Sequence, residues 1–436
     1  MTKCNSSTLV FTGVGSRQVE ADFSGGFITS DGGVPLLREM DRHLGLTKAV
    51  AGQLADERQA GKIDHSMLSL VRQRVYALAL GYEDGNDHDQ LRHDLALQSA
   101  VGRDGELASP PTLCRLENRA DREWCRAISG VLVEQFISSF DVPPQELILD
   151  FDATDVPVHG GQVGRFFHGY YNEYCFLPLY VFCGDRLLMA YLRPSRNDGA
   201  RHAGAILKLL VRRLRQSWPG VRIVFRADSG FCRRRIMHWC EHNDVGYLLG
   251  LAKNSVLNGM AEPWMAQARA TAGEKGTARM FADLRYAAQT WKRSRRVILK
   301  AERLPEKDNH RYLVTNLAGE ANLLYEKVYC ARGEAENRIK EQQLDLFASR
   351  TSCHEWWSNQ FRLLLSALAY TLVEAIRRTA LHGTELAEAT CATIRLRLFK
   401  IGAVVLRNTR RIRILLSGAY PWQNLFRLVT ARLSTA

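Results

Sequence analysis

Apolar runs in the middle of the chain predict strands, and periodic apolar positions between and around them predict helices. The strands are expected, in chain order, at 146–153, 174–183, 186–192, 221–227 and 246–251. The helices between the later strands are expected at about 202–215 and 233–243. This order favours a mixed sheet covered by helices, with its first three strands antiparallel. The sequence therefore predicts an α/β fold.

The segment before these strands has a different pattern. Residues 1–140 are predicted to be mostly helical, with one helix over 34–44 after Asp31 and another over 67–80 after Asp64. An acidic residue just before an apolar periodic run is a common helix start. This pattern indicates a separate helical N-terminal domain.

The segments after the central strands are less regular. Residues 252–321 alternate in patches and predict a β-rich insertion where another helix would be expected. Helices resume at about 322–347 and 354–380. In the tail, apolar residues alternate with arginine over 394–398 and 411–414, which predicts two strands with a basic face.

Positive charge is in excess and is concentrated at the end of the chain. The 59 Lys and Arg outnumber the 46 Asp and Glu, which gives a formal charge of +13. From Cys391 to Ala436 there are nine Lys or Arg and no Asp or Glu. Such a distribution predicts a polyanionic partner. No uninterrupted apolar stretch reaches the length that spans a bilayer, so no membrane partner is expected.

The cysteines indicate a reducing compartment. None of the ten forms a Cys-x-x-Cys pair, and the N-terminus lacks the pattern of a signal peptide. Free thiols in the cytoplasm are therefore predicted. Zinc binding by Cys232, His238, Cys240 and His242 is an alternative, but the two cysteines lie two turns apart on one predicted helix. This spacing favours core thiols and surface histidines.

Three carboxylates stand in three different local contexts. Asp152 lies within one predicted strand, Asp228 ends another, and Glu336 lies in a helical segment. Neighbouring strands deliver side chains to one edge of a sheet and a packed helix can add a third, so we expect the three acids to converge. Two Asp and one Glu suit a pair of Mg²⁺ ions about 4 Å apart, and Mn²⁺ equally. Taken singly, each acid is also explained as a turn or capping carboxylate.

The residues around these acids carry a resemblance to a known family. The first acid begins Asp152-Ala153-Thr154, the second lies in Arg226-Ala227-Asp228-Ser229-Gly230-Phe231, and the third completes the spacing Tyr329, Arg332, Glu336. The chain resembles the DDE transposases of bacterial insertion sequences, in the group with a Tyr, Arg, Glu, Lys signature. That resemblance implies a ribonuclease H-like core. The family's Lys, seven positions after the Glu, falls on Gln343, and Lys340 is the basic residue one turn beyond Glu336.

The resemblance also implies roles and a reaction. Asp152 and Asp228 would hold one Mg²⁺ and Glu336 the second, while Arg332, Tyr329 and Lys340 would contact DNA phosphates. The implied function is cut-and-paste transposition: binding of the terminal inverted repeats, cleavage, and attack of the freed 3′-hydroxyl on target DNA. Two ends must be held together, which implies at least a homodimer on double-stranded DNA. The implied location is the bacterial cytoplasm, at the nucleoid.

Three groups of basic residues are further candidates for DNA contact. A short helix beginning at Ser109-Pro110 presents Arg115 and Arg119 and is typical of a recognition helix, although a capped surface helix has the same pattern. The tail contributes Arg410, Arg411 and Arg413. In the insertion, Trp291 is followed by Lys292, Arg293, Arg295 and Arg296. Trp291 suits either stacking on an unpaired base or burial in a strand.

The predicted domains follow from these patterns. In chain order they are a helical DNA-binding domain at 1–140, the first part of the catalytic core at 141–251, the β-rich insertion at 252–321, the second part of the core at 322–385, and a basic DNA-contacting region at 386–436. Two other functions remain open. One is a metal-dependent DNA nuclease on the same core, and the other is a non-catalytic, domesticated DNA-binding protein.

Overall fold

The computed structural model describes residues 8–273 and 276–435. The chain divides into two compact units. Unit 1 is formed by Met1–Arg119 together with Leu368–Ala436, and unit 2 by Ala120–Ala367. Both ends of the chain therefore contribute to one unit, whereas the five domain boundaries drawn from the sequence remain predictions. Among the described residues, no helix is both long enough and apolar enough to cross a membrane.

Unit 2 is built on one eight-stranded sheet with the order β12-β13-β14-β11-β10-β4-β8-β9. Strand β4 pairs antiparallel with β8, β8 pairs antiparallel with β9, and β10 runs parallel to both β4 and β11. The mixed sheet predicted for a ribonuclease H-like core is therefore present. Its first three strands in chain order, β4, β8 and β9, are antiparallel, as expected. The strands are β4 (Glu146–Ala153), β8 (Leu179–Cys183), β9 (Arg186–Tyr191), β10 (Arg222–Ala227), β11 (Val245–Leu251), β12 (Ala278–Tyr286), β13 (Arg295–Arg303) and β14 (Arg311–Thr315).

Helices cover this sheet and bury its apolar side chains. They include α7 (Arg122–Ser138), α8 (Ala203–Ser217) and α9 (Arg234–His242). Helix α8 places Ile206, Leu210 and Leu214 at every fourth position in the same core cluster as Phe151 and Phe225 of the strands. Each such side chain stabilises the fold by about 1.5–3 kcal/mol when it leaves water. The predicted helices at 202–215 and 233–243 are confirmed.

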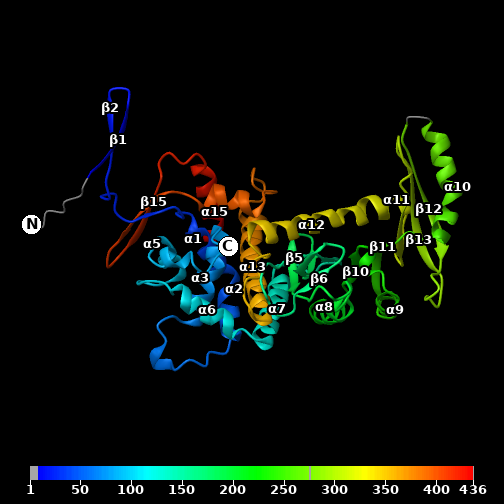
Figure 1. Ribbon diagram of the computed structural model, residues 1–436, viewed down its shortest axis with the longest axis horizontal. Coiled ribbons are helices and arrows are strands. Elements are labelled where there is room, and N and C mark those ends of the chain that lie inside the picture. The colour runs from blue at the N-terminus through cyan, green and yellow to red at the C-terminus, as the bar shows by residue number, and fades with distance from the viewer. Residues whose placement is uncertain (1–7, 274–275, 436) are drawn as a thin grey trace, which may run out of the picture. The chain divides into compact units, whose positions relative to one another are not determined.

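The segment 252–321 differs from its prediction in one respect. Its strands β12, β13 and β14 are present, but an 18-residue helix, α10 (Ser255–Ala272), precedes them and packs along β12 and β13 (Figure 1). The prediction that no helix follows β11 was therefore wrong. Asn254 caps α10 by accepting a hydrogen bond from Leu257 N at 3.0 Å. The helix contains Pro263, and its buried face still has helical spacing: Leu257, Ala261, Met265 and Ala268.

The strand predicted at 174–183 is two strands. Strand β7 (Glu173–Phe176) pairs with β5 (Val156–Pro157) and β6 (Phe166–His168) in a small separate sheet, and β8 begins only at Leu179. Proline has no N–H to donate to a ladder, and Pro178 lies at the break. An apolar run that looks continuous in sequence therefore changes sheets at this proline.

A long helical stretch follows β14 (Figure 1). It consists of α11 (Ala321–Leu323), η3 (Leu324–Tyr329), η4 (Cys330–Arg332), α12 (Gly333–Lys340) and η5 (Glu341–Asp345). The next helix is α13 (Trp356–Ala375), extended by η6 (Ile376–Ala380). Both helical regions agree with the predictions at 322–347 and 354–380. The first is not a uniform α-helix, because wide and tight turns alternate where its signature residues lie.

Unit 1 combines helices from the N-terminal segment with elements from the C-terminal segment. The first group is α1 (Val34–Leu44), α2 (Leu46–Gln53), η1 (Ala60–Lys62), α3 (Met67–Leu80), α4 (His88–Leu91), α5 (Leu95–Val101) and α6 (Pro110–Arg119). The second is α14 (Cys391–Ile394), η7 (Arg395–Phe399), β15 (Ala403–Arg407), β16 (Ile412–Leu416) and α15 (Gln423–Thr435). Strand β15 lies between β16 and β3 (Ile28–Thr29), which joins the two ends of the chain in one sheet.

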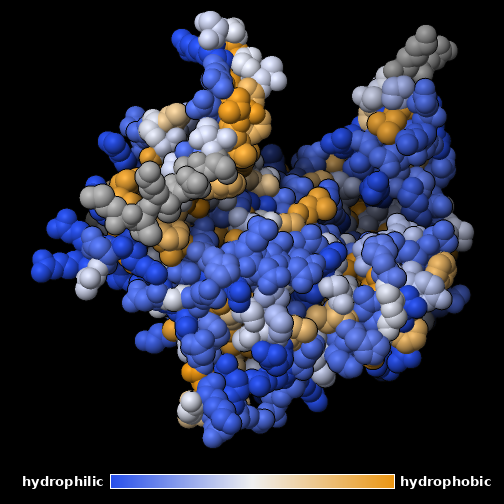
Figure 2. Space-filling view, turned by 60° about the vertical axis from the view of Figure 1, so that its left-hand side comes forward, coloured by the Kyte–Doolittle hydropathy of each residue, from blue (hydrophilic) through white to orange (hydrophobic). Residues whose placement is uncertain are grey.

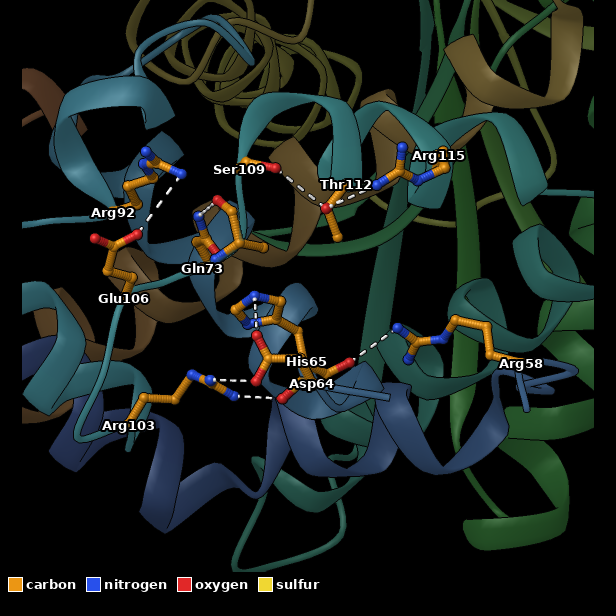
Figure 3. A network of polar contacts seen from close by, with 11 residues as sticks. Arg58, Asp64, His65, Gln73, Arg92, Arg103, Glu106, Ser109, Thr112 and Arg115 are labelled. Atoms are coloured by element: carbon orange, nitrogen blue, oxygen red, sulfur yellow. Dashed lines mark hydrogen bonds and ion pairs between the residues drawn. The ribbon is translucent and has the colours of Figure 1, made fainter. Parts of the chain in front are cut away.

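Two local predictions for unit 1 need correction. Residues 394–398 are helical, not a strand: Thr390 caps the turn by accepting from Thr393 N at 3.3 Å, and both Ile394 and Leu398 are buried one turn apart. The cap of α3 is Ser66 and not Asp64, whose carboxylate instead accepts from Arg103 at 3.0 Å (Figure 3). The predicted bounds of α1 and α3 are confirmed.

A hairpin of β1 (Leu9–Val14) and β2 (Arg17–Ala21) has every residue exposed. Figure 2 shows apolar side chains along it, and Phe11 and Val14 are among the exposed apolar residues. These two strands were not predicted, because residues 1–140 were expected to be mostly helical.

Unit 1 also contains a buried histidine that makes its stability sensitive to acid. His88 is fully buried, with its ring 3.0 Å from Gln73 Nε2 and 3.2 Å from Arg74 Nη1. Burial, and then the charge of Arg74, lowers the pKa of His88 from 6.5 to about 3. A histidine that binds its proton less readily when folded stabilises the protein above pH 6.5, and this stability is lost as the pH falls toward 3.

We therefore expect the His88→Gln variant to be less sensitive to acid. Between pH 7 and pH 5 the wild type should lose about 2 kcal/mol more unfolding free energy than the variant. Urea unfolding at the two pH values measures this difference. Equal losses in both proteins would contradict a neutral, buried His88.

Candidate active site

Two of the three predicted acids lie at the same edge of the sheet. Asp152 is near the end of β4, and Asp228 directly follows β10. The two strands are parallel neighbours in which Ala227 is aligned with Phe151, so that the next residue along each strand is one of the acids. The pairing of β4 with β10 therefore brings Asp152 and Asp228 to adjacent positions.

A tight turn fixes the carboxylate of Asp228. Its Oδ1 accepts a hydrogen bond from Gly230 N at 2.9 Å, which caps η2 (Ser229–Phe231). This is the turn role that the alternative interpretation of Asp228 predicted, and it also holds the side chain in one orientation. Gly250 of β11 passes close behind this turn, because a Cβ placed there would lie 2.7 Å from Ser229 N and 3.0 Å from Tyr329 Oη.

Glu336 joins the site through Arg332. The guanidinium of Arg332 donates from Nη1 to Asp152 Oδ2 at 3.2 Å and from Nη2 to Glu336 Oε1. The side chains of Asp152 and Arg332 are each 17% exposed, and that of Glu336 is 41% exposed. One cation therefore connects the strand acid to the helix acid.

The other two acids act on the charge of Asp152. Burial raises the pKa of Asp152 to about 6; Arg332 opposes this shift, and the negative charges of Asp228 and Glu336 add to it. Burial also raises the pKa of Tyr329, with a further contribution from Asp228. An Asp whose charge is this costly has a strong tendency to bind a cation.

A buried ion pair between Arg226 and Asp150 supports the elements that carry the three acids. The sequence did not indicate this pair as part of the site. Arg226 of β10 donates through Nη2 to Asp150 Oδ2 at 2.6 Å, and a second bond joins Nε to the same carboxylate. Arg226 Nη1 also donates to the carbonyl oxygen of Val328, next to Tyr329. One side chain therefore connects β4, β10 and the helical stretch that carries Glu336. Its signal in the sequence is a charged residue inside each of two apolar strands.

The remaining signature positions have different surroundings. Tyr329 is half-buried and packs against Tyr325, with ring centroids 5.9 Å apart. Lys340 is exposed at the end of α12. Gln343, at the position where the resemblance implies a lysine, donates to the carbonyl oxygen of Asp155 at 2.9 Å and so ties the end of this helical stretch to the segment after β4.

The predicted cations around Trp291 make internal contacts. Trp291 packs against Tyr286 at a centroid distance of 5.6 Å, and the guanidinium of Arg295 lies 5.0 Å from its ring. Arg293 and Arg295 both pair with Glu241, and Arg296 pairs with Asp283. These contacts favour the packing interpretation of Trp291. They place Lys292, Arg293 and Arg295 beside α9, where the three line one pocket.

The DNA-contact candidates of unit 1 lie on its surface. Arg115 and Arg119 are exposed on the outer face of α6, opposite Leu113 and Leu116, and Arg115 donates to Thr112 Oγ1 at 3.0 Å (Figure 3). The other candidates, Arg410, Arg411 and Arg413, are exposed in the β15–β16 hairpin.

The residues present fit a hard divalent cation better than zinc. All three acids are oxygen donors, and a guanidinium is already held between two of them, so the site is suited to positive charge. In the described part of the chain, no three His, Cys, Asp or Glu side chains form a ready-made metal cage. The zinc alternative is also weakened because Cys240 is buried in the core while His238 and His242 contact one another at the surface.

Comparison with known proteins identifies the family. The family described as transposase DDE domain, group 1, matches residues 11–436, nearly the whole chain. The chain belongs to this transposase DDE domain family, which confirms the resemblance found in the sequence. DDE transposase domains generally use divalent metal ions. No curated protein matches the chain. A solved structure that it resembles, a piggyBac transposase synaptic complex with hairpin DNA, has a TM-score of 0.44 and 12% identity over 85% of this chain and 79% of that chain.

Proposed function

We propose that the protein is a cut-and-paste DNA transposase that binds the terminal inverted repeats of an insertion sequence, cleaves the DNA and joins the freed 3′ end to target DNA. The observation that carries this proposal is that Arg332 binds both Asp152 and Glu336, while strand pairing brings Asp228 next to Asp152. Family membership supplies the reaction class, and the site supplies three acids able to hold the metal ions that it needs.

In this proposal Asp152, Asp228 and Glu336 would hold two Mg²⁺ ions, with Mn²⁺ able to replace them. Such a pair activates the attacking oxygen and stabilises the leaving oxygen. Arg332 has a guanidinium that fits two oxygens of a phosphate, so that it can transfer its contacts from the carboxylates to DNA when metal ions neutralise them. Tyr329 would orient the helical stretch by packing its hydroxyl against Gly250 of β11. Arg226 would fix the backbone of the same stretch through its hydrogen bond to the carbonyl oxygen of Val328.

The proposed partner is double-stranded DNA, both at the element ends and at the target. The outer face of α6 and the arginines of the β15–β16 hairpin are its proposed contacts in unit 1, since exposed arginines bind phosphates and base edges. Two ends must be held together for joining, so a homodimer is the proposed working unit.

The joining of pre-cleaved DNA tests this function. Element-end duplexes with a free 3′-hydroxyl are incubated with the full chain, Mg²⁺ and a target plasmid, and the covalent joint products are measured on a denaturing gel. We expect joined product with element ends that carry a 3′-hydroxyl. We expect none with the same duplexes ending in a 2′,3′-dideoxynucleotide, which lacks that hydroxyl. Cleavage of intact DNA without joining would identify a nuclease, and binding without either reaction would identify a non-catalytic DNA-binding protein.

A further inference from the structure

A second strongly cationic site lies in unit 2, and none of the three acids lines it. It is a pocket of about 300 Å³ between α9 and the segment that joins β12 to β13. Helix α9 contributes Arg234, Arg235, His238 and His242 to its walls. The facing wall comes from a second set: Lys292, Arg293 and Arg295. Every lining residue found in the described chain is thus an arginine, a lysine or a histidine, and the volume is at the lower end of the range for ligand pockets.

Arg295 is the most buried of the residues that line this pocket. Its side chain is 5% exposed, its Nε donates to Glu241 Oε1 at 2.7 Å, and its guanidinium lies over the ring of Trp291. Its Nη1 is buried and has no hydrogen-bond partner within the described residues. A buried donor left without an acceptor costs about 1–3 kcal/mol, so a ligand oxygen that reached Nη1 from the pocket that Arg295 lines would remove this cost.

The positive charge around Arg295 favours an anionic ligand. Five permanently charged side chains, four arginines and one lysine, line the pocket, and the ion pairs found for them among the described residues are those of Arg293 and Arg295 with Glu241. The rings of His238 and His242 lie 4.0 Å apart at its rim. The charge of His242 is the largest cause of a lowered pKa at His238, and Arg293 and Lys292 contribute to the same shift. One carboxylate cannot neutralise this set of cations.

We propose that this pocket binds a phosphate group, with Arg295 as its central donor and Arg235 and Lys292 at its entrance. Phosphate is favoured over a carboxylate because several N–H donors converge from two walls, and phosphate offers three or more oxygens and up to two negative charges. The phosphate could be that of a DNA backbone, a source that rests on the proposed function, or a free phosphate, which does not depend on it.

The test uses a double variant that spares the buried ion pair. Arg235 and Lys292 are both exposed, so that Arg235→Gln/Lys292→Gln removes two charges from the pocket without leaving Glu241 unpaired. The matched control is Arg212→Gln/Lys253→Gln, which removes two exposed charges from the same unit outside the pocket. Equal urea midpoints of the two variants establish that both are folded.

Two titrations of the full chain then decide the proposal. In calorimetry with inorganic phosphate, we expect binding to the wild type and the control, and at least tenfold weaker binding to the pocket variant. In fluorescence anisotropy with a DNA duplex, we measure the slope of log affinity against log salt concentration. We expect the magnitude of this slope to fall by about 1 more in the pocket variant than in the control, because a variant that contacts fewer phosphates releases fewer counterions on binding.

The outcomes separate the two sources and the two proposals. Weaker phosphate binding with an unchanged DNA slope supports a site for free phosphate and overturns the DNA backbone as its source. Phosphate binding that is lost in the pocket variant, in a chain that binds no DNA at all, supports the pocket while the proposed transposase function fails. Equal phosphate affinities and equal slopes in the pocket and control variants overturn the pocket proposal.

Discussion

Replacing Asp152 with asparagine is expected to abolish Mg²⁺-dependent nicking of element-end DNA, with a loss of roughly 10³-fold or more, while DNA binding stays within about twofold of the wild type. Asparagine keeps the shape of the side chain but removes the charge that a metal ion requires. It also removes one of the two carboxylates that hold Arg332. Nicking of a supercoiled plasmid that carries the element end measures the first effect, and a gel shift measures the second.

The same result is expected for Glu336→Gln, and the chain offers a matched control for it. Glu334 lies two residues earlier on α12 and its side chain is 66% exposed, so that Glu334→Gln makes the same chemical change outside the carboxylate set. We expect Glu334→Gln to nick DNA at close to the wild-type rate. Nicking by Asp152→Asn or Glu336→Gln at the rate of this control would contradict the catalytic assignment of the acids.

Replacing Arg226 with methionine is expected to destabilise the protein by about 3–5 kcal/mol, because it leaves the carboxylate of Asp150 buried without its partner. Asp150 is 2% exposed and burial already raises its pKa, a shift that Arg226 opposes. The matched control is Arg222→Met on the same strand, since Arg222 is 73% exposed and lies 3.6 Å from Glu146. The control should change stability by less than about 1 kcal/mol.

A double variant separates the structural role of Arg226 from its positioning role. Asp150→Leu/Arg226→Met replaces the buried pair with apolar side chains and should recover most of the lost unfolding free energy. It does not restore the hydrogen bond from Arg226 to the carbonyl oxygen of Val328, which fixes the helical stretch of Glu336. We therefore expect a stable protein that binds DNA but nicks it at least tenfold more slowly. Nicking restored together with stability would show that Arg226 acts through stability alone.

The sequence predicted the core of unit 2 well because its elements are simple. The strands at 146–153 and 221–227 combine strong apolar character with an acid at one end, and the structure places them as parallel neighbours. Two of the wrong predictions each have a local cause. Pro263 weakened the helical pattern of α10, and alternating arginines at 394–398 suggested a strand although the buried residues of that segment lie one turn apart.

The site was predicted less completely than the fold. Glu336 could be named because its spacing with Tyr329 and Arg332 is specific, and the two Asp because each lies in or at the end of an apolar run within a short motif. The role of Arg226 could not be predicted, since its bond to the Val328 carbonyl joins residues 102 positions apart and depends on how a helix packs on two strands. Arg293 and Arg295 were predicted as cations open to DNA, but Glu241, an ordinary helix residue in the sequence, binds both.

The construction of unit 1 from both ends of the chain affects its synthesis. Unit 2 is complete once residue 367 has been made, whereas unit 1 needs β15, α15 and their neighbours from the last part of the chain. A product that terminates just after residue 367 would carry all three acids but lack the whole C-terminal part of unit 1, Leu368–Ala436. A stop codon at that point would therefore leave a fragment that carries the three acids without a complete unit 1, and not a shortened but otherwise intact protein.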